Sequence, residues 1–287
     1  MSLLFLRSLH RTRARIDRSR LMVKLSILIA TNRIDSWLDE ALASVGSDKF
    51  VDEIVLVLDG IAPTEEQVKN FPSKTVIVLK GESSGLAAAL NLGLSQCSGT
   101  YIARLDSDDI SLPARFASSL FFLDSNMTHV AVGGRACAIS GDGKNLGFSL
   151  PRRVRDTPDC RALLLERNVL IHPTMTIRAD SLIAIGGYDN DMKSMEDYDL
   201  WLRLAAYGEI AILPHEMLKY RIHSSQMTKY ARPFGAHISK IFASRLKLAK
   251  VLGKSKTYAT GYFVAWELKQ IYRYSKYRLT ALVSHGR

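Results

Sequence analysis

The chain has 287 residues, of which 47% are hydrophobic and 23% charged, a composition that fits a folded protein with a large core and excludes a disordered one. Its net charge of +11 is concentrated at the ends: residues 1–23 have six arginines against one aspartate, residues 231–287 have twelve Lys or Arg against Glu267, and the centre is acidic. No nucleic-acid-binding motif accompanies these basic ends, so nucleic acid is excluded as a partner.

Residues 1–23 form a basic amino-terminal segment that differs from a signal peptide. Its arginines follow the short apolar run instead of preceding it, and no small-residue cleavage site closes it. Two interpretations remain open, an amphipathic segment on an anionic membrane face and a solvated tail. The chain has no run of roughly eighteen apolar residues that would span a membrane. Its three scattered cysteines lack CxxC spacing and favour a reducing compartment, so we expect a cytoplasmic protein.

The next part of the chain alternates buried strands with helices. Apolar runs at residues 25–30, 53–58 and 75–79 predict strands, and apolar residues recur at helical spacing over 37–45. This alternation predicts a parallel sheet with right-handed crossovers. Asp59 ends the second strand, where it either binds a ligand or caps a turn before a glycine.

The main candidate site follows a helix at residues 86–94 and a strand at residues 101–105. Asp106 and Asp108 come at the carboxyl end of that strand, and in an extended chain residues i and i+2 point to the same side. Two adjacent carboxylates repel unless a proton or a divalent cation lies between them. Mg²⁺ or Mn²⁺ is commonly held by such carboxylates together with substrate phosphates. An acidic surface turn is the alternative interpretation.

A second acidic pair, Glu196 and Asp197, lies in the first turn of a predicted amphipathic helix that ends at Gly208. Asp199 and Arg203 form an i,i+4 pair on this helix. The helix dipole favours acidic residues in a first turn even without a catalytic task. A carboxylate at this position also suits a general base.

Three blocks in the expected order carry a family resemblance. They are residues 25–59, the segment SGLAAALNLGLSQCSGTYIARLDSDDISLPARF that begins at Ser84, and residues 172–223. Together they resemble family 2 glycosyltransferases with the GT-A fold, of the type that makes bacterial cell-surface polysaccharides, over roughly residues 24–228. The resemblance implies a Rossmann-like α/β domain at residues 24–230, with a mostly parallel central sheet flanked by helices and a C-terminal helical extension.

The resemblance also implies roles for single residues. Asp106 and Asp108 would hold Mn²⁺ or Mg²⁺ against a nucleotide-diphosphate donor, and Asp197 would be the base that takes the acceptor's proton. Thr31 would lie near the nucleotide, and Asp59 would read its base, since a carboxylate accepts the imide N–H of uracil and cytosine lacks that donor. Two positions beside Asp59 depart from the family pattern: Leu58 replaces a common aspartate, and Ile61-Ala62 replaces Ser-Thr.

The segment Tyr220-Arg221-Ile222-His223 matches the family's Tyr-Arg-x-His. By resemblance Arg221 would oppose donor phosphate charge and His223 would ligate the ion, and a structural histidine is the alternative. The Gln-x-x-Arg-Trp of processive members is absent, which favours the addition of one sugar per encounter. An arginine-rich stretch is expected in a loop near the acceptor or the donor's pyrophosphate, with a solvated edge as the alternative. Its members are Arg152, Arg153 and Arg155.

Residues 231–287 lie beyond this resemblance and predict two basic, aromatic-rich helices joined near residues 253–260. They either pack on the catalytic domain or a second copy, or bind an anionic membrane. We favour the membrane, because Tyr and Trp prefer the headgroup level and each basic residue there contributes about 1 kcal/mol. The expected location is the inner face of the plasma membrane, where a lipid-linked acceptor would lie.

The predicted function is therefore inverting, metal-dependent transfer of a hexose or N-acetylhexosamine. The donor is a nucleotide-diphosphate sugar, with uridine favoured, and the acceptor is a hydroxyl of a glycan or a lipid-linked sugar. A sugar-nucleotide nucleotidyltransferase is one alternative, but residues 30–33 are not a glycine-rich basic phosphate loop. A non-catalytic, membrane-associated binding module is another, and it leaves the acidic blocks without a purpose.

Overall fold

The computed structural model describes residues 24–83, 85–152, 154, 156–224, 226 and 235–284, and side chains as far as residue 276. The predicted amino-terminal segment 1–23, Arg153 and Arg155 lie outside these residues.

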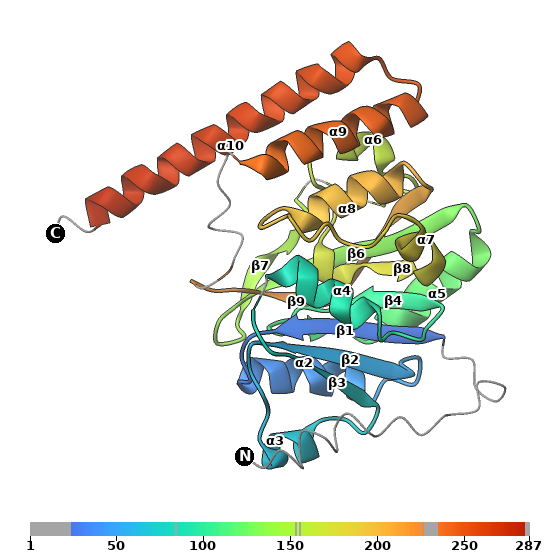
Figure 1. Ribbon diagram of the computed structural model, residues 1–287, viewed down its shortest axis with the longest axis vertical. Coiled ribbons are helices and arrows are strands. Elements are labelled where there is room, and N and C mark those ends of the chain that lie inside the picture. Colours follow the sequence, from blue (N-terminus) through green and yellow to red (C-terminus); the bar gives the residue numbers. More distant parts are fainter. Residues whose placement is uncertain are drawn as a thin grey trace.

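The fold is built on one mixed sheet whose strand order is β3-β2-β1-β4-β8-β6-β9-β5, with β7 paired to β6 (Figure 1). The strands are β1 Leu25–Thr31, β2 Glu53–Asp59, β3 Thr75–Lys80, β4 Tyr101–Arg104, β5 Ile110–Ser111, β6 His129–Ser140, β7 Asn145–Leu150, β8 Thr176–Arg178 and β9 Glu209–Ile222. The first four are parallel to one another, β8 is antiparallel to both β4 and β6, and β9 is parallel to β6. The predicted α/β class with a mostly parallel central sheet is confirmed.

The strands nearest the amino terminus are buried on both faces, as expected for a parallel sheet covered by helices. In β1, Leu28 and Ala30 face one hydrophobic core, whereas Leu25, Ile27 and Ile29 face the other. This alternation follows from the two-residue repeat of a strand, and it explains why β1 reads as a continuous apolar run.

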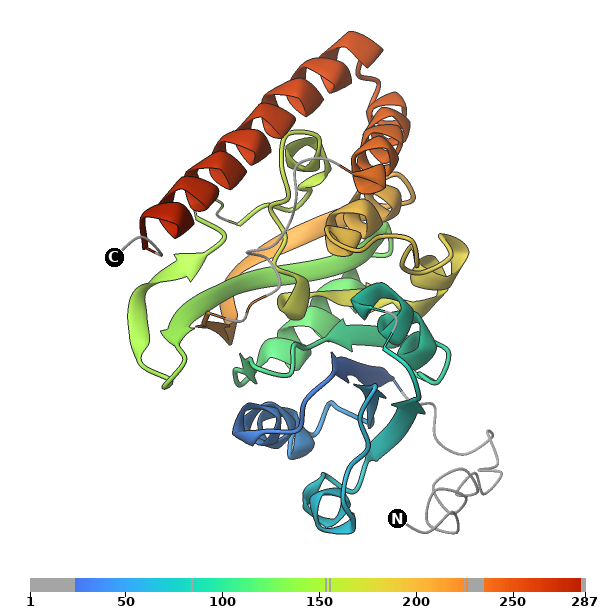
Figure 2. The same cartoon turned by 60° about the vertical axis from the view of Figure 1, so that its left-hand side comes forward.

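Helices cover both faces of the sheet (Figures 1 and 2). They are α2 Ser36–Gly46, α3 Glu65–Asn70, α4 Leu86–Leu94, α5 Arg115–Ser125, α6 Arg161–Leu164, α7 Ala179–Ala184, α8 Glu196–Ala205, α9 Ala236–Val251 and α10 Lys256–Ser284, with a 3-10 turn at His172–Thr174. Helices α2 and α5 pack on one face, and α4 and α8 pack on the other. A Cβ at Gly93 of α4 would lie 2.4 Å from the Leu28 side chain, so this glycine is what lets α4 approach β1 closely.

The two predicted C-terminal helices are present as α9 and α10, and they turn at Gly253, whose φ of +65° is in the left-handed region. Figure 1 shows them stacked beyond α8, with α10 extending past the rest of the described chain. Their buried residues join the same core as α4 and α8: Ile241, Leu248, Ala249, Ala259 and Trp266. The described parts of the chain before and after residues 227–234 therefore contribute to one hydrophobic core.

Candidate active site

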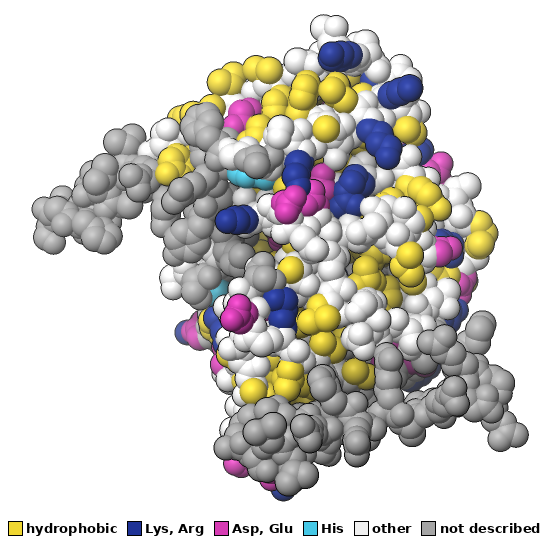
Figure 3. Space-filling model, in the orientation of Figure 1, with side chains coloured by type: hydrophobic (Ala, Val, Ile, Leu, Met, Phe, Trp, Pro, Cys, Tyr) yellow, Lys and Arg dark blue, Asp and Glu magenta, His cyan; other side chains and the backbone are white. Residues whose placement is uncertain are grey.

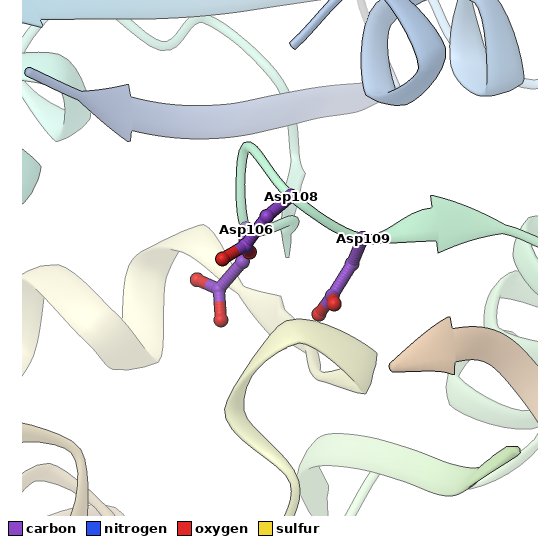
Figure 4. Close-up of side chains that lie close together, drawn as sticks. All are labelled: Asp106, Asp108 and Asp109. Atoms are coloured by element: carbon purple, nitrogen blue, oxygen red, sulfur yellow. The ribbon is translucent and has the colours of Figure 1, made fainter. Parts of the chain in front are cut away.

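The site lies where β1, β2 and β4 end, at the edge of the sheet where α/β proteins commonly bind ligands. Thr31 is the last residue of β1, Asp59 is the last of β2, and Asp106, Asp108 and Asp109 lie in the connection from β4 to β5. Figure 4 shows the three aspartate side chains leaving this connection toward one space.

The aspartate turn, residues 106–109, brings three carboxylates together. One oxygen from each lies within 4.8 Å of the others. Asp106 and Asp108 were expected to point to the same side of an extended segment. In the structure, β4 ends at Arg104 and residues 107 and 108 form a turn. The turn also brings in Asp109, which is 1% exposed and for which no separate role was predicted. Three adjacent acidic residues in the chain were the available signal.

Burial and the closeness of the carboxylates raise pKa values in the aspartate turn. Burial, followed by the charge of Asp108, raises the pKa of Asp106, although the Arg104 guanidinium acts in the opposite direction. Burial and the charges of Asp106 and Asp108 raise the pKa of Asp109 well above its ordinary value. One oxygen of Asp109 accepts the Arg221 N–H at 2.8 Å, and the other is buried without a hydrogen-bond partner. Three crowded carboxylates with an unpartnered oxygen suit a hard divalent cation.

Two buried arginines lie beneath the turn. Arg104 is 3% exposed and donates to Asp106 and to the Leu28 carbonyl, the latter at 3.2 Å. Arg115, from the Pro-x-Arg of the sequence block, donates to the Arg104 carbonyl at 2.6 Å. Burial lowers the pKa of Arg115 to about 9, with Asp109 acting in the opposite direction. These cations partly offset the negative charge of the turn from inside the protein.

Strand β9 places His223 and Arg221 against the same turn. His223 shares a hydrogen bond of 2.7 Å between its Nε2 and Asp108, and its ring lies 4.7 Å from the Trp37 ring. The structure therefore brings His223 beside a predicted metal ligand, and ligation itself stays a prediction.

The Arg221 guanidinium is buried and bound by protein oxygens. It donates to the Asp108 carbonyl at 2.8 Å, to the Gly141 carbonyl at 2.9 Å and to Glu40 at 2.6 Å. These contacts make Arg221 a support of the aspartate turn, and its expected contact with donor phosphate stays a prediction.

Asp59 and Thr31 lie at neighbouring strand ends, and both are 7% exposed. Asp59 accepts a hydrogen bond from Ser83 at 2.8 Å, and its other oxygen lies 3.6 Å from Lys80 Nζ. The Thr31 hydroxyl donates to the Arg33 carbonyl at 3.0 Å, which shapes the turn after β1. Lys80 and Ser83 tie the next connection of the sheet to Asp59, so this carboxylate does more than cap its own turn.

The acidic pair begins α8, as predicted. Asp197 accepts from the Tyr198 N–H at 2.7 Å with one oxygen and from the Asn168 amide at 3.0 Å with the other. Burial raises the pKa of Asp197, and the charge of Asp106 adds to this effect. Burial and the charge of Asp197 raise the pKa of Glu196 to about 7. The charge of Asp106 acts on both residues, so the start of α8 lies within electrostatic range of the aspartate turn.

The sequence did not assign roles to Asn168, His172 or Tyr188. His172 and the Tyr188 hydroxyl share a hydrogen bond of 2.8 Å, and burial, with the charge of Arg104, lowers the pKa of His172 well below its ordinary value. His172 is therefore neutral near pH 7. Both residues lie within the third sequence block, but nothing in their spacing revealed the contact.

The predicted pair Asp199 and Arg203 is present at 2.7 Å. Arg152 is exposed and its guanidinium lies 4.4 Å from the Phe148 ring, which fits the solvated-edge alternative for this residue.

The sheet thus has an acidic turn at its strand ends, the edge where open α/β sheets bind ligands, and a carboxylate pair at the start of α8. The sequence profile of glycosyl transferase family 2 matches residues 26–185, and that of glycosyltransferase-like family 2 matches residues 170–278. The chain belongs to glycosyl transferase family 2 and is a glycosyltransferase. The second match corrects the expected limit of the resemblance near residue 228, because it includes α9 and most of α10.

Characterised relatives come from bacterial polysaccharide synthesis. The chain is 33% identical over 220 residues to the amylovoran biosynthesis glycosyltransferase AmsE of Erwinia amylovora, covering 74% of this chain and 80% of the relative. It is 29% identical over 197 residues to the UDP-Gal:alpha-D-GlcNAc-diphosphoundecaprenol beta-1,3-galactosyltransferase of Escherichia coli, covering 64% of this chain and 69% of the relative.

The fold also resembles a solved structure, that of S. aureus TarS residues 1–349 in complex with UDP-GlcNAc. The TM-score is 0.67 at 15% identity, over 84% of this chain and 70% of that one. At this identity the likeness supports the fold.

Proposed function

We propose that the protein transfers one hexose or N-acetylhexosamine from a uridine-diphosphate sugar to a hydroxyl of a glycan or lipid-linked acceptor, with inversion. The observation that carries this proposal is that two acidic groups from different elements lie within electrostatic range of each other. The charge of Asp106, after β4, raises the pKa of Asp197 at the start of α8. This supports a donor phosphate site and a base that serve one reaction.

The donor's diphosphate would lie against the aspartate turn. Asp106 and Asp108 would hold Mn²⁺ or Mg²⁺, with His223 beside them, and the bound cation would supply charge neutralisation for the leaving diphosphate. Arg104 and Arg115 keep the turn compact by offsetting its negative charge.

Asp197 would act as the base. Its two hydrogen bonds fix the carboxylate while leaving lone pairs free to take the acceptor hydroxyl's proton. A pKa raised by burial makes this carboxylate a stronger base than an exposed one. The acceptor oxygen bonds to the anomeric carbon, and the bond from that carbon to the diphosphate breaks with its electron pair leaving on the diphosphate. A single displacement from the opposite face inverts the configuration.

The preference for uridine rests on Asp59 and on the relatives. An ionised Asp59 can accept the uracil imide N–H. One relative is named for a UDP-galactose donor, and the TarS structure contains UDP-GlcNAc. These names support a uridine-diphosphate hexose or N-acetylhexosamine as the donor class.

An acceptor at an anionic membrane, on the inner face of the plasma membrane, is the second part of the proposal. Among the described residues, no helix combines the length and apolar content needed to cross a bilayer. Helix α10 instead exposes Val264, Leu268 and Tyr272, spaced four residues apart, beside exposed Lys269 and Arg273. Figure 3 shows hydrophobic and basic side chains together over the α9–α10 region. An apolar stripe flanked by cations suits shallow binding to anionic lipid.

Vesicle sedimentation tests this membrane surface. The variant Leu268→Gln/Tyr272→Gln should lose binding to vesicles rich in phosphatidylglycerol, and Phe121→Gln, which alters a 74% exposed side chain on α5, should bind as the wild type does. Equal binding by all three proteins, or no binding by the wild type, would remove α10 as a membrane surface.

Turnover of UDP-sugars tests the reaction itself. A panel of UDP-hexoses and UDP-N-acetylhexosamines should be consumed with Mn²⁺ and spared with EDTA, and the NMR coupling constant of the product should report inversion. Formation of UTP and sugar 1-phosphate only when pyrophosphate is added, instead of UDP, would indicate a nucleotidyltransferase. Binding of all donors without turnover would support the binding-module alternative.

A further inference from the structure

Helix α9 carries a buried arginine, Arg245, that contacts α8. Arg245 is 0% exposed, and its guanidinium lies 4.9 Å from the Trp266 ring and 5.4 Å from the Tyr198 ring. A buried cation is costly to keep unless it makes specific interactions. Aromatic faces stabilise part of its charge, and the remainder depends on hydrogen bonds.

The Arg245 hydrogen bonds join two segments. One guanidinium nitrogen donates to the Leu165 carbonyl at 2.8 Å, just after α6, and another donates to the Tyr198 hydroxyl at 2.6 Å on α8. The Tyr198 hydroxyl in turn donates to the Leu164 carbonyl at 2.7 Å. Three hydrogen bonds therefore fix the end of α6 to the first turn of α8.

Each of the two segments, the first turn of α8 and the chain after α6, also contains a hydrogen-bond donor to Asp197. The Tyr198 N–H binds one Asp197 oxygen at 2.7 Å. Asn168, three residues after Leu165, binds the other oxygen at 3.0 Å. The Asn168 side chain is itself oriented, because its oxygen accepts the Leu170 N–H at 3.2 Å. Each oxygen of the Asp197 carboxylate is thus held by a segment that Arg245 fixes.

We propose that Arg245 is a positioning residue for Asp197, so that the C-terminal helices are part of the catalytic machinery. This inference rests on the proposed role of Asp197 as the base. A base must lie within hydrogen-bond reach of the proton it takes, and a misplacement of about 1 Å can cost roughly 10²-fold in rate. The two donors to Asp197 are the Tyr198 N–H on α8 and the Asn168 amide after α6. Arg245 binds both of these segments and so fixes their relative position.

Other contacts attach α9 to the domain independently of Arg245. Ser244 donates to Asp199 on α8 at 2.7 Å. Lys240 pairs with Asp189 at 2.7 Å and with Asp191 at 2.9 Å, in the loop that precedes α8. With these contacts intact, loss of the Arg245 hydrogen bonds is expected to leave α9 docked and to loosen the alignment of Asp197.

Three variants test the inference. Arg245→Met keeps an unbranched apolar stem but removes the guanidinium and its donors, and Tyr198→Phe removes only the hydroxyl. Lys247→Met is the matched control, because Lys247 is exposed on the same helix. The measurements are kcat and KM for the UDP-sugar that the enzyme consumes, binding of UDP with Mn²⁺, and melting temperature.

Arg245→Met and Tyr198→Phe should each lower kcat about tenfold or more, with UDP binding within about twofold of the wild type. Lys247→Met should behave as the wild type. If Arg245→Met does not fold, Tyr198→Phe decides, since it leaves the ring packing in place. Wild-type kcat in Tyr198→Phe, or a loss of UDP binding equal to the loss of kcat, would overturn the positioning role.

A double-mutant cycle separates this inference from the proposed base. In an Asp197→Asn background, Tyr198→Phe should cause no further loss of residual transfer, because there is no base left to position. Multiplying losses would mean a general structural effect and would overturn the positioning role while the base assignment stood. Wild-type transfer by Asp197→Asn alone would overturn the base assignment, and the positioning role with it.

Discussion

The two acidic groups of the site are both partly buried, but the groups that bind them differ in charge. The aspartate turn lies among cations: Arg104 binds Asp106, and Arg33 lies 3.5 Å from Asp108. Asp197 is held instead by neutral donors, an amide and a backbone N–H. Burial is the largest cause of the raised pKa of both Asp106 and Asp197.

The difference indicates two kinds of chemistry. Within the turn, the carboxylates raise one another's pKa, and a shared cation relieves that repulsion. The donors that bind Asp197 are neutral and bring no positive charge to the carboxylate. Such a carboxylate is suited to taking up a proton. Such different environments would let one site combine the proposed metal ligands with the proposed base.

A large effect is expected on the cation side of the comparison. Asp108→Asn should lower metal-dependent transfer by about 10²- to 10³-fold, because it removes a charged ligand from the diphosphate site. Steady-state kinetics with titrated Mn²⁺ measure this effect. Asp142→Asn, an exposed aspartate in the β6–β7 turn, is the control. Turnover by Asp108→Asn that matches the wild type would exclude Asp108 from the metal site.

A smaller effect is expected at the nucleotide. Asp59→Asn should weaken binding of UDP by about 10- to 100-fold, since a hydrogen bond to a charged group is replaced by one to a neutral amide. Binding of CDP, which lacks the imide N–H, should change less. Calorimetry with both nucleotides in the presence of Mn²⁺ measures the ratio. An unchanged UDP-to-CDP ratio would mean that Asp59 does not contact the base.

The order of strands illustrates how much of the fold could be predicted. The runs at residues 25–30 and 53–58 predicted β1 and β2 because strands buried on both faces are continuously apolar. The long strand β9, Glu209–Ile222, was not predicted as a strand, since its exposed centre at His215 and Glu216 interrupts the apolar pattern. Its role depends on pairing with β6, a contact between distant parts of the chain.

Within the site, local chemistry was predictable and long-range support was not. Asp106 and Asp108 stand together in the sequence, so their proximity followed from spacing alone. Asn168 and Arg245 act through contacts with Asp197 and Tyr198 that the fold creates. The sequence of the C-terminal helices is likewise basic and aromatic, a pattern that fits either membrane binding or packing on the protein core. In the structure, Trp266 is buried and Tyr272 is 69% exposed, so α10 has both kinds of face.

Asn168→Asp sharpens the comparison by placing a charge where a neutral amide now binds Asp197. A second carboxylate 3.0 Å away should raise the Asp197 pKa further, so the acid limb of the kcat profile should move to higher pH by about one unit. Well below the midpoint of that limb, this shift corresponds to a loss of about tenfold. Asn168→Ala removes the hydrogen bond without adding charge and should lower kcat with a smaller shift. An unmoved acid limb in Asn168→Asp would dissociate that limb from Asp197.

The smallest effect concerns stability without metal. Burial raises the Glu196 pKa from 4.5 to about 7, so the folded state favours the protonated form. This contribution to the unfolding free energy is complete below about pH 4.5 and disappears as the pH rises through about 7. Relative to Glu196→Gln, the EDTA-treated wild type should therefore lose about 1–3 kcal/mol between pH 5 and pH 8. Denaturant titrations measure this loss, and Glu66→Gln, on an exposed face of α3, should show the wild-type slope.

The most direct test of the account is transfer by Asp197→Asn compared with its binding of UDP and Mn²⁺. Asparagine keeps the shape of the side chain but cannot take a proton, so transfer should fall by about 10²- to 10⁴-fold. Binding of UDP with Mn²⁺ should stay within about twofold of the wild type, because the aspartate turn and Asp59 are unchanged. Transfer at the wild-type rate would contradict the assignment of Asp197 as the base, and a parallel loss of UDP binding would contradict the separation of the two acidic groups.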